Sequence, residues 1–352
     1  MVLEKFDARL EHLPNSVWTK IAQIDELKGR WVGGVHLSPQ VLGRLKQSVL
    51  VTSTGASTRI EGASLSDEDV EKLMRGILVQ KFTDRDKQEV QGYFELLQNV
   101  FQAGKHGRLS ESTIKHFHGE LLKYVDKDKL HRGEYKKAEN KVHMVDSEGK
   151  SISVVFDATP AYLTPKEMQE LVEWTQNALN NKAFHPLLVI ANFVAEFLMI
   201  HPFQDGNGRL SRVLTNLLLL QQGYSHIPYM SHEKLIEDNK PDYYIALRKS
   251  QKTFKTEKED IAPWLDFFFS MILEQAKRAV ALLSKEAIEK LFSPNQIAVL
   301  DYFQNADEVT ASDLVSKLEI PRPTINQVLL RLIKFKKIER IGLGRSTRYR
   351  KV

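Results

Sequence analysis

The stretch that decides the fold is residues 201–212, His201-Pro-Phe-Gln-Asp-Gly-Asn-Gly-Arg-Leu-Ser-Arg212. It lies between two apolar runs of helical length, 186–200 and 210–220. Runs that are apolar on nearly every face are typical of helices buried inside a helical domain. Because Pro202 disfavours helical dihedrals at the residue before it, the first helix is predicted to end at His201. The imidazole is therefore expected at the edge of the core.

The turn at Gly206-Asn207-Gly208 has the character of an anion-binding site. Its glycines permit positive φ angles and a close approach of the backbone. The second helix is expected to begin here, with Leu210 and Ser211 in its first turns, so free N–H groups and the positive end of the dipole face one place. Arg209 and Arg212 are three residues apart and can both reach that place, and forked guanidinium groups suit phosphate oxygens. Two arginines at such a turn predict a polyphosphate ligand.

Two further side chains beside this turn can supply chemistry. Asp205 is a hard oxygen ligand, and the Mg²⁺ carried by ATP is typically held by one or two protein carboxylates together with phosphate oxygens. Mn²⁺ is the alternative metal. His201 can accept a proton from an attacking hydroxyl near neutral pH. A base, a phosphate cradle, two cations and a metal ligand together predict phosphoryl or nucleotidyl transfer, in which positioning and charge stabilisation carry most of the catalysis.

The spacing matches the Fic signature His-x-Phe-x-Asp/Glu-Gly-Asn-Gly-Arg-x-x-Arg at every defined position. The chain thus resembles Fic-family proteins, which transfer AMP from ATP to a protein hydroxyl. The resemblance implies that His201 is the general base, Asp205 orients Mg²⁺, Phe203 anchors the loop in the core, and Arg209 and Arg212 hold the β and γ phosphates. Attack at the α-phosphate would release pyrophosphate. Another nucleotide or a phosphocholine donor, and the removal of AMP under other metal conditions, are open alternatives within the family.

Two other segments resemble parts of Fic proteins around the same site. Residues 142–156 contain two β-prone segments around a Ser-Glu-Gly turn and are predicted to form a hairpin. By resemblance it is the flap that holds a target protein as an added strand. Tyr243-Tyr244 resembles the tyrosine pair that borders the adenine pocket, with helix core as the other interpretation. Seven residues beyond the pair, where relatives often have an asparagine on the purine side of ATP, this chain has Gln251, to which the resemblance assigns the purine contact.

Upstream, Ser57-Thr-Arg-Ile-Glu61-Gly62 resembles the inhibitory motif Ser/Thr-x-x-x-Glu-Gly/Asn of Fic proteins. The resemblance implies that Glu61 pairs with Arg212 and blocks the productive pose of the γ-phosphate. Without it, Glu61 is only a carboxylate before a loop, and Ser66 with the acidic residues after it caps the next helix. The resting protein is accordingly expected to be autoinhibited.

Composition excludes several classes of protein. With 352 residues and 42% apolar content, the chain is long enough for two or three domains. It has no cysteine, which excludes disulfides, thiolate metal sites and a cysteine nucleophile and fits a reducing, cytoplasmic compartment. The amino terminus carries acidic residues where a signal peptide needs basic ones, and no stretch supplies the roughly 20 apolar residues of a membrane helix.

Apolar periodicity predicts a mainly α fold, a Fic-type helical core with the small hairpin flap. Helices are expected in 65–103, 110–125, about 164–180 and 262–292. The helix at Thr164 is expected to start with that residue as cap, Pro165 in the first position and Glu167 in a capping box. The expected domains are an amino-terminal helical region at 1–110 with the inhibitory motif (57–62), a catalytic core at 111–290, and a smaller unit at 291–352. Fic cores often pair through surface helices, so a homodimer is expected.

Residues 291–352 read as a winged helix-turn-helix. Helices are expected at 295–304, 311–318 and 323–334, followed by a basic hairpin, the wing, at 338–350. Residues 294–352 hold 11 Lys and Arg against 6 Asp and Glu, so the net charge of +5 belongs to this end. Such modules place the second helix of the pair in the major groove of DNA. The side chains placed to read bases or contact phosphates are Arg322, Thr324, Asn326, Gln327, Arg331, Arg345, Arg348 and Arg350.

The charge surplus of this unit is modest, and winged helices also serve as protein docking or dimerisation units. Two interpretations of the whole chain follow. The first is an AMP transferase that acts on proteins. The second is a DNA-binding regulator whose Fic core senses a nucleotide.

Overall fold

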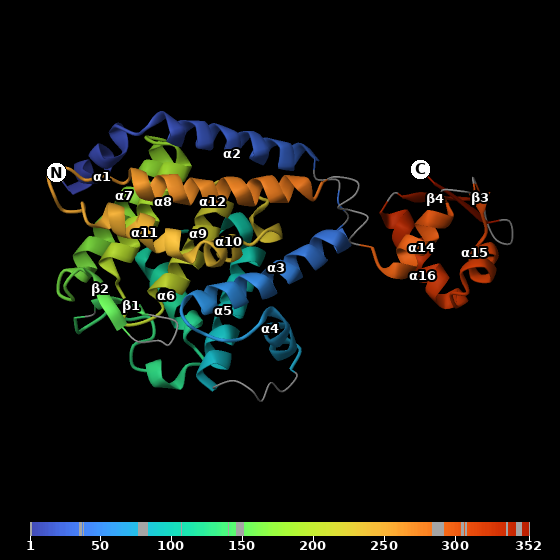
Figure 1. The fold of residues 1–352 in the computed structure, drawn as a ribbon, viewed down its shortest axis with the longest axis horizontal. Helices are drawn as coiled ribbons and strands as arrows, with labels where there is room; N and C mark the ends of the chain where they lie inside the picture. Colours follow the sequence, from blue (N-terminus) through green and yellow to red (C-terminus); the bar gives the residue numbers. More distant parts are fainter. Residues whose placement is uncertain are drawn as a thin grey trace. The chain divides into compact units, whose positions relative to one another are not determined.

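The structure is a computed structural model. It describes residues 2–34, 37, 39–76, 84–106, 108–139, 141–145, 151–283, 292–303, 306, 308–335, 337–342 and 347–351. The chain divides into two compact units, drawn in Figure 1: residues 1–32 with 45–278, and residues 33–44 with 279–352.

The first unit is built mainly from helices, as the sequence predicts. Its elements are α1 (Val2–Glu11), α2 (Asn15–Gly34), α3 (Pro39–Ile60), α4 (Asp67–Met74), α5 (Asp84–Ala103), α6 (Glu111–Leu121), β1 (Lys141–Val145), β2 (Ser151–Asp157), α7 (Thr164–Asn181), α8 (Pro186–Ile200), α9 (Asn207–Gln221), α10 (His232–Asp238), α11 (Lys240–Gln251) and α12 (Ala262–Ala281). The last residues of α2 and α12 and the first residues of α3 belong to the second unit. Three short 3₁₀ turns interrupt the connections at Gly104–His106, Asp126–Asp128 and Ile227–Tyr229. None of the helices in the described part of the chain has both the length and the apolar content to cross a bilayer.

The core of this unit is the pair α8 and α9. They pack against each other; α7 and α11 contact α8, and α5 and α6 contact α9 (Figure 1). Nearly every side chain of α8 is buried, because the helix is apolar on all faces. The two predicted buried runs are thus confirmed as the centre of the fold, and the motif 201–212 forms the turn between them.

The predicted hairpin is present. β1 and β2 pair antiparallel, with Val142 opposite Phe156 and Met144 opposite Ser153. The pairing shifts register twice along its length. The turn of the hairpin, residues 146–150, lies outside the described residues.

The expected helices within 65–103 are α4 and α5, whereas two other expectations about helices need correction. The helix expected at 262–292 ends at Ala281 as α12, and 284–291 lie outside the described residues. The capping box at Thr164 is wrong, because Leu163 occupies the cap position and the Thr164 hydroxyl donates to the carbonyl of Pro160. Glu167 is instead held by tertiary partners: it accepts hydrogen bonds from Thr159 Oγ1 (2.5 Å) and Lys255 Nζ (2.7 Å).

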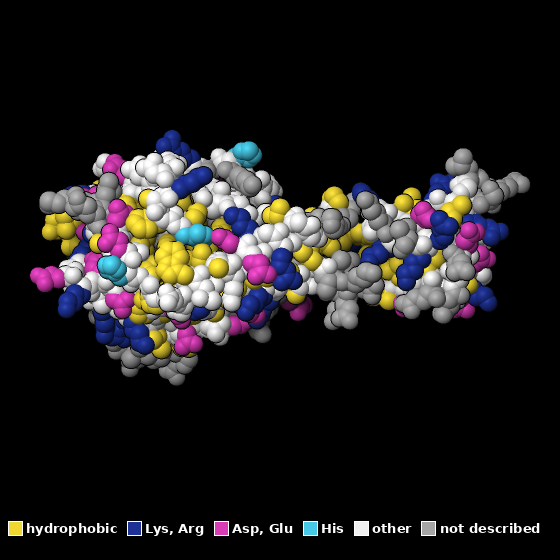
Figure 2. Space-filling view, turned by 90° about the horizontal axis from the view of Figure 1, so that it is seen from above, with side chains coloured by type: hydrophobic (Ala, Val, Ile, Leu, Met, Phe, Trp, Pro, Cys, Tyr) yellow, Lys and Arg dark blue, Asp and Glu magenta, His cyan; other side chains and the backbone are white. Residues whose placement is uncertain are grey.

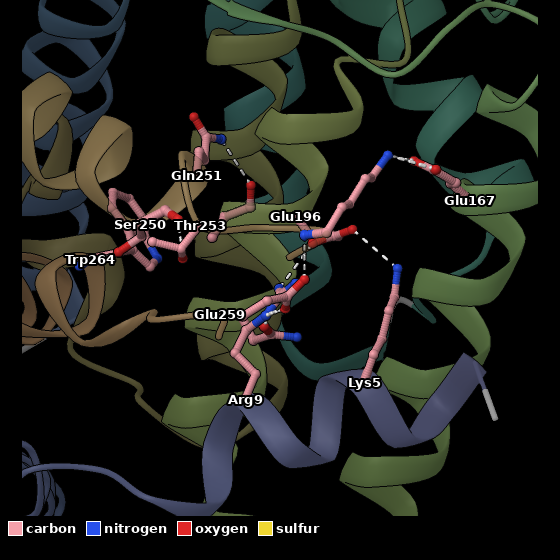
Figure 3. Close-up of polar contacts among 12 residues, drawn as sticks. Lys5, Arg9, Glu167, Glu196, Ser250, Gln251, Thr253, Glu259 and Trp264 are labelled. Carbon is pink, nitrogen blue, oxygen red and sulfur yellow. Dashed lines mark hydrogen bonds and ion pairs between the residues drawn. The ribbon is translucent and has the colours of Figure 1, made fainter. Parts of the chain in front are cut away.

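The amino-terminal helix α1 is attached to the core through a buried ion cluster. Arg9 Nη1 donates to Glu196 Oε2 and to Asn192 Oδ1 on α8, both at 2.9 Å. Its Nε donates to Glu259 Oε2 at 2.6 Å, and Lys5 lies 3.5 Å from Glu196. The labelled side chains of Figure 3 show α1 joined in this way to two distant segments of the chain.

The second unit contains α14 (Pro294–Tyr302), β3 (Glu308–Val309), α15 (Ala311–Leu318), α16 (Arg322–Lys334), β4 (Ile338–Ile341) and β5 (Arg348–Lys351). Its sheet is antiparallel with the order β3-β5-β4, and capping boxes at Ser293 and Thr310 start α14 and α15. The expected helices are observed to within about two residues. The assignment as a winged helix stays a prediction, and Arg345 lies outside the described residues.

Charged side chains of both signs are mixed on the visible face of this unit, as Figure 2 shows. Arg348 lies 3.5 Å from Glu308, and Arg350 pairs with Glu339. Part of the positive charge expected to face DNA is therefore balanced within the unit.

Candidate active site

His201 stands at the carboxyl end of α8, as predicted from Pro202. It caps the helix in the left-handed region with φ 51°, and its N–H donates to the carbonyl of Phe197 at 2.9 Å. Such a backbone conformation is unusual for a residue with a side chain and is often found at functional sites. Burial, assisted by the positive charge of Lys136, lowers the pKa of His201 to about 4. The imidazole is therefore neutral at physiological pH.

The loop that follows is closed by an amide and fixed by an aromatic stack. Asn207 Oδ1 accepts from the N–H of Phe203 at 2.9 Å, and its Nδ2 donates to the Phe203 carbonyl at 2.8 Å. The Phe203 ring is fully buried and stacks on His118, with 3.8 Å between ring centroids and 9° between planes. Gly206 has φ 81°, and a Cβ there would lie 3.2 Å from Leu121 Cδ2. The loop thus has little freedom to change shape.

His118 on α6 supports this loop and was not predicted from the sequence. Its Nδ1 accepts from the N–H of Gly133 at 3.0 Å, so the proton is on Nε2, which donates to the Asp205 carbonyl at 3.1 Å. Burial lowers the pKa of His118 to about 4, which keeps this tautomer neutral. A buried histidine within an amphipathic helix gives no sequence signal that separates such a role from ordinary packing.

Asp205 belongs to a closed ring of four charged side chains. Its Oδ1 accepts from the Gly206 N–H (2.6 Å) and from Arg209 Nη2 (3.2 Å), and its Oδ2 accepts from Arg85 Nη2 (3.1 Å). Glu89 completes the ring, at 2.8 Å from both arginines. Burial alone would raise the pKa of Asp205, but Arg209, the Gly206 N–H and Arg85 together lower it. Arg85 and Glu89 are two further residues that sequence reasoning missed.

The donor set around Asp205 fits a metal that arrives with a polyphosphate. Among the described residues, no three His, Asp or Glu side chains gather as a metal site would require. The Asp205 side chain is 36% exposed, and its Oδ2 accepts a hydrogen bond from Arg85. A single accessible carboxylate beside a phosphate cradle is what Mg²⁺ uses when phosphate and water oxygens complete its octahedron. Asp205 would hold the metal in that arrangement.

The Arg212 side chain is almost fully buried and donates three hydrogen bonds to the end of α3 and the residue after it. Its Nε donates to Ser57 Oγ (2.8 Å), and its Nη2 donates to the Ser57 carbonyl (2.9 Å) and to Glu61 Oε1 (2.8 Å). Burial would lower the pKa of Arg212, but Glu61, Tyr243 and Tyr93 together raise it, and the guanidinium stays charged. The structure thus brings the segment Ser57–Gly62, at the end of α3, to the start of α9.

Glu61 also lies directly against the glycine-rich turn. A Cβ built on Gly208 would stand 2.2 Å from Glu61 Oε1, so only glycine leaves room for this carboxylate. Gly208 is in the first turn of α9, where backbone N–H groups lack helical partners and the dipole is positive. The carboxylate of Glu61 therefore lies at the positive end of the α9 dipole.

The three predicted residues of α11 have different surroundings. Tyr243 lines a small cavity together with Arg212. Burial and the charge of Glu61 raise the pKa of Tyr243 to about 12 against the opposing charge of Arg212, and the same two causes raise the pKa of Tyr244. Gln251 is 2% exposed, and its Nε2 donates to the Ala195 carbonyl on α8 at 3.1 Å (Figure 3). The pair is brought to the site, whereas Gln251 is buried between two helices, and its predicted contact with the purine stays a prediction.

The Fic/DOC family profile matches residues 108–219, which span α6 to α9 and include the whole turn between the two buried helices. The chain contains a Fic domain. A crystal structure of a Fic family protein from Desulfovibrio desulfuricans G20 is 25% identical, covers 97% of both chains and has a TM-score of 0.65. A Fic domain containing signaling protein from Bacteroides thetaiotaomicron VPI-5482, 23% identical over 74% of this chain and 96% of its own, shares the fold with a TM-score of 0.61.

Relatives of the Fic domain carry an enzyme name. A probable protein adenylyltransferase from Aquifex aeolicus is 25% identical over 172 residues, which are 46% of this chain and 53% of the relative. The protein adenylyltransferase Fic of Aedes aegypti is 41% identical over 63 residues, 17% of this chain and 13% of the relative. The chain thus matches about half or less of the length of these two proteins.

Proposed function

We propose that this protein is an adenylyltransferase that moves AMP from ATP onto a Ser, Thr or Tyr hydroxyl of a protein, itself included. The observation that carries the proposal is the arrangement at the start of α9. A neutral histidine, an accessible carboxylate and two arginines surround a helix N-terminus that already accommodates one carboxylate, that of Glu61. Adenylyltransferase-named relatives support the same reaction.

In the proposed reaction, the acceptor hydroxyl oxygen attacks the α-phosphorus of ATP. A new P–O bond to the acceptor forms, the bond from the α-phosphorus to the bridging oxygen breaks, and pyrophosphate leaves with the electron pair. His201 takes the hydroxyl proton, since its ring is neutral. The N–H groups of Gly206–Gly208 and the two arginines balance negative charge on the phosphates. Mg²⁺ or Mn²⁺ on Asp205 would supply further positive charge to the same oxygens.

We propose that Glu61 inhibits this reaction in the resting protein. Its carboxylate lies against Gly208 and pairs with Arg212 at 2.8 Å, so a γ-phosphate would have to replace it at both contacts. The side chain is 32% exposed, and it can therefore leave without opening the core. Removal of AMP from a modified target by the same site is part of the proposal.

The flap supports a mode of target binding. A two-stranded sheet has free edges, and an extended segment of a target can pair with one of them as a third strand. This mode needs backbone complementarity more than a particular sequence. It thus fits a protein acceptor, including a segment of the chain itself.

The proposal is tested by intact-mass spectrometry after incubation with each nucleoside triphosphate and Mg²⁺. Glu61→Gly is expected to gain AMP from ATP, wild type to gain little, and Glu61→Gly/His201→Ala to gain none. A Glu61→Gly protein that acquires no adduct from any nucleotide would count against transfer. A faster wild type would count against inhibition by Glu61.

The second unit supports a second candidate, a DNA-binding regulator. Its order of helices and strands matches the predicted winged helix, and Arg322, Asn326, Gln327 and Arg331 are exposed along α16. Leu330 on the same helix is 67% exposed, which suits a protein partner better than phosphates. Fluorescence anisotropy with random-sequence duplexes tests this candidate. Binding that falls steeply with salt and with Arg322→Ala/Arg331→Ala supports it, and no binding at low salt excludes it.

A further inference from the structure

Lys136 lies in the connection between α6 and β1 and is 4% exposed. A lysine is rarely so buried unless it has a partner of opposite charge or several acceptors. Its backbone N–H donates to the carbonyl of Pro202 at 2.9 Å, and its Nζ donates to the carbonyl of Ile200 at 3.1 Å. The residue between these two carbonyls is His201. One side chain and its own backbone thus bind the chain on both sides of the histidine.

The two hydrogen bonds from Lys136 stabilise the backbone at the end of α8. The carbonyl of Ile200 is at the end of α8, where the last carbonyls lack helical donors and the dipole is negative. A positive ammonium is favourable there. His201 has φ 51°, a conformation that the surrounding contacts must maintain. Neighbouring residues of the same segment support the loop further along, since Gly133 binds His118 and the Tyr135 ring lies 5.5 Å from Phe203.

We propose that Lys136 is a positioning residue for the reaction: it fixes the backbone on both sides of His201 and places a positive charge beside the imidazole. The inference rests on the proposed role of His201 as the base, and it adds a residue outside the 201–212 motif. It also explains why a lysine, and not an apolar residue, is enclosed at this point. An apolar side chain would leave the Ile200 carbonyl without this donor.

The charges around Lys136 and His201 determine whether the pKa of His201 rises or falls when Lys136 is replaced. Glu139 and Glu167 favour the charged form of Lys136 and Lys255 opposes it, but burial dominates and lowers the pKa of Lys136 to about 8. Around His201, Lys136 opposes protonation, while Glu61 and Asp205 favour it. Loss of the Lys136 charge should therefore raise the pKa of His201.

The test uses the full chain in the Glu61→Gly background. Lys136→Met is expected to lower kcat for AMP transfer by about 100-fold, because a small displacement of a base has effects of that size. KM for ATP should stay within about twofold, since the phosphate cradle is on α9. Lys136→Arg, which retains the charge and donors, should restore most of kcat. Lys137→Met, an exposed neighbour, is the control and should behave as the parent.

A second measurement does not depend on activity. Histidine NMR, with His201 assigned by its loss in His201→Ala, should show the pKa of His201 raised in Lys136→Met and unchanged in Lys137→Met. In wild type, the chemical shift of the His201 signal should change near pH 8, where Lys136 loses its proton. This titration needs no variant and therefore does not depend on whether a variant folds. A His201 pKa that is unchanged in Lys136→Met overturns the proposal, as does parental kcat in that variant. If no variant forms an AMP adduct, the proposed function fails, while the NMR titration still judges Lys136.

Discussion

Gly208 is the residue at which the position of Glu61 can be tested directly. A Cβ there would meet Glu61 Oε1 at 2.2 Å, so Gly208→Ala must displace the carboxylate or strain the first turn of α9. We expect the alanine to lower the free energy of unfolding, and the loss to be smaller by about 1–3 kcal/mol when Glu61→Gly is also present. Urea unfolding of the four proteins of this cycle measures the coupling. Gly119→Ala, where a Cβ has no atom within 4 Å, is the control.

An equal cost of Gly208→Ala in both backgrounds would show that Glu61 does not lie against the turn.

The same residues show what sequence can and cannot reveal about the site. The motif predicted His201 at a helix end because Pro202 imposes a local rule. It could not reveal His118 or Arg85, because their bonds to Asp205 span 87 and 120 residues of sequence.

At the scale of elements, α1 depends on the ion cluster around Arg9. The side chains of Arg9 and Glu196 are each 1% exposed, so removal of one leaves a buried charge without its main partner. We expect Arg9→Ala to lower the free energy of unfolding by about 3–5 kcal/mol. Trp174 reports on α1 directly, since its Nε1 donates to Asp7 Oδ1 at 2.8 Å and its ring lies 5.0 Å from that of Phe6. Tryptophan fluorescence in urea therefore measures the effect.

Lys5 is the control for this cluster, since it is 31% exposed and lies 3.5 Å from Glu196. Lys5→Met should lower the free energy of unfolding by under about 1 kcal/mol. Arg9→Met/Glu196→Gln should recover more than half of the loss, because no full charge is then stranded on α8. A loss in Arg9→Ala no larger than in Lys5→Met would mean that α1 is held by its apolar face alone.

Elements with a strong apolar period were predicted well, and elements defined by distant partners were not. The limits of α8 and α15 follow from local patterns and agree with the structure to within a residue. The start of α7 does not, because Glu167 is drawn to Lys255, 88 residues away, and not to the helix N-terminus. For residues 1–56 the sequence predicted a helical region without helix limits, and the attachment of α1 through Arg9 spans 183 to 250 residues.

At the scale of the whole molecule, buried neutral histidines should make the first unit sensitive to acid. Burial lowers the pKa values of His118, His201 and His226 to about 4, against 6.5 for an ordinary histidine. Between pH 6.5 and 4 the unfolded chain binds more protons than the folded one. The contribution of these histidines to the free energy of unfolding is therefore fully present above pH 6.5. It falls as the pH decreases through that window, by up to about 1.4 kcal/mol per pH unit for each histidine.

His226 can be separated from the site because it lies near Trp31 and Tyr224, and neither of its ring nitrogens has a hydrogen-bond partner among the described residues. His226→Phe keeps the ring shape without a titrating group, so its urea midpoint should fall less than that of wild type between pH 7.5 and 5. All four tryptophans lie in the first unit, so fluorescence follows that unit alone. His12→Phe, at an exposed position, should leave the wild-type pH dependence intact. Parallel curves for wild type and His226→Phe would mean that this ring reaches water before the unit unfolds, and that its burial does not contribute to acid sensitivity.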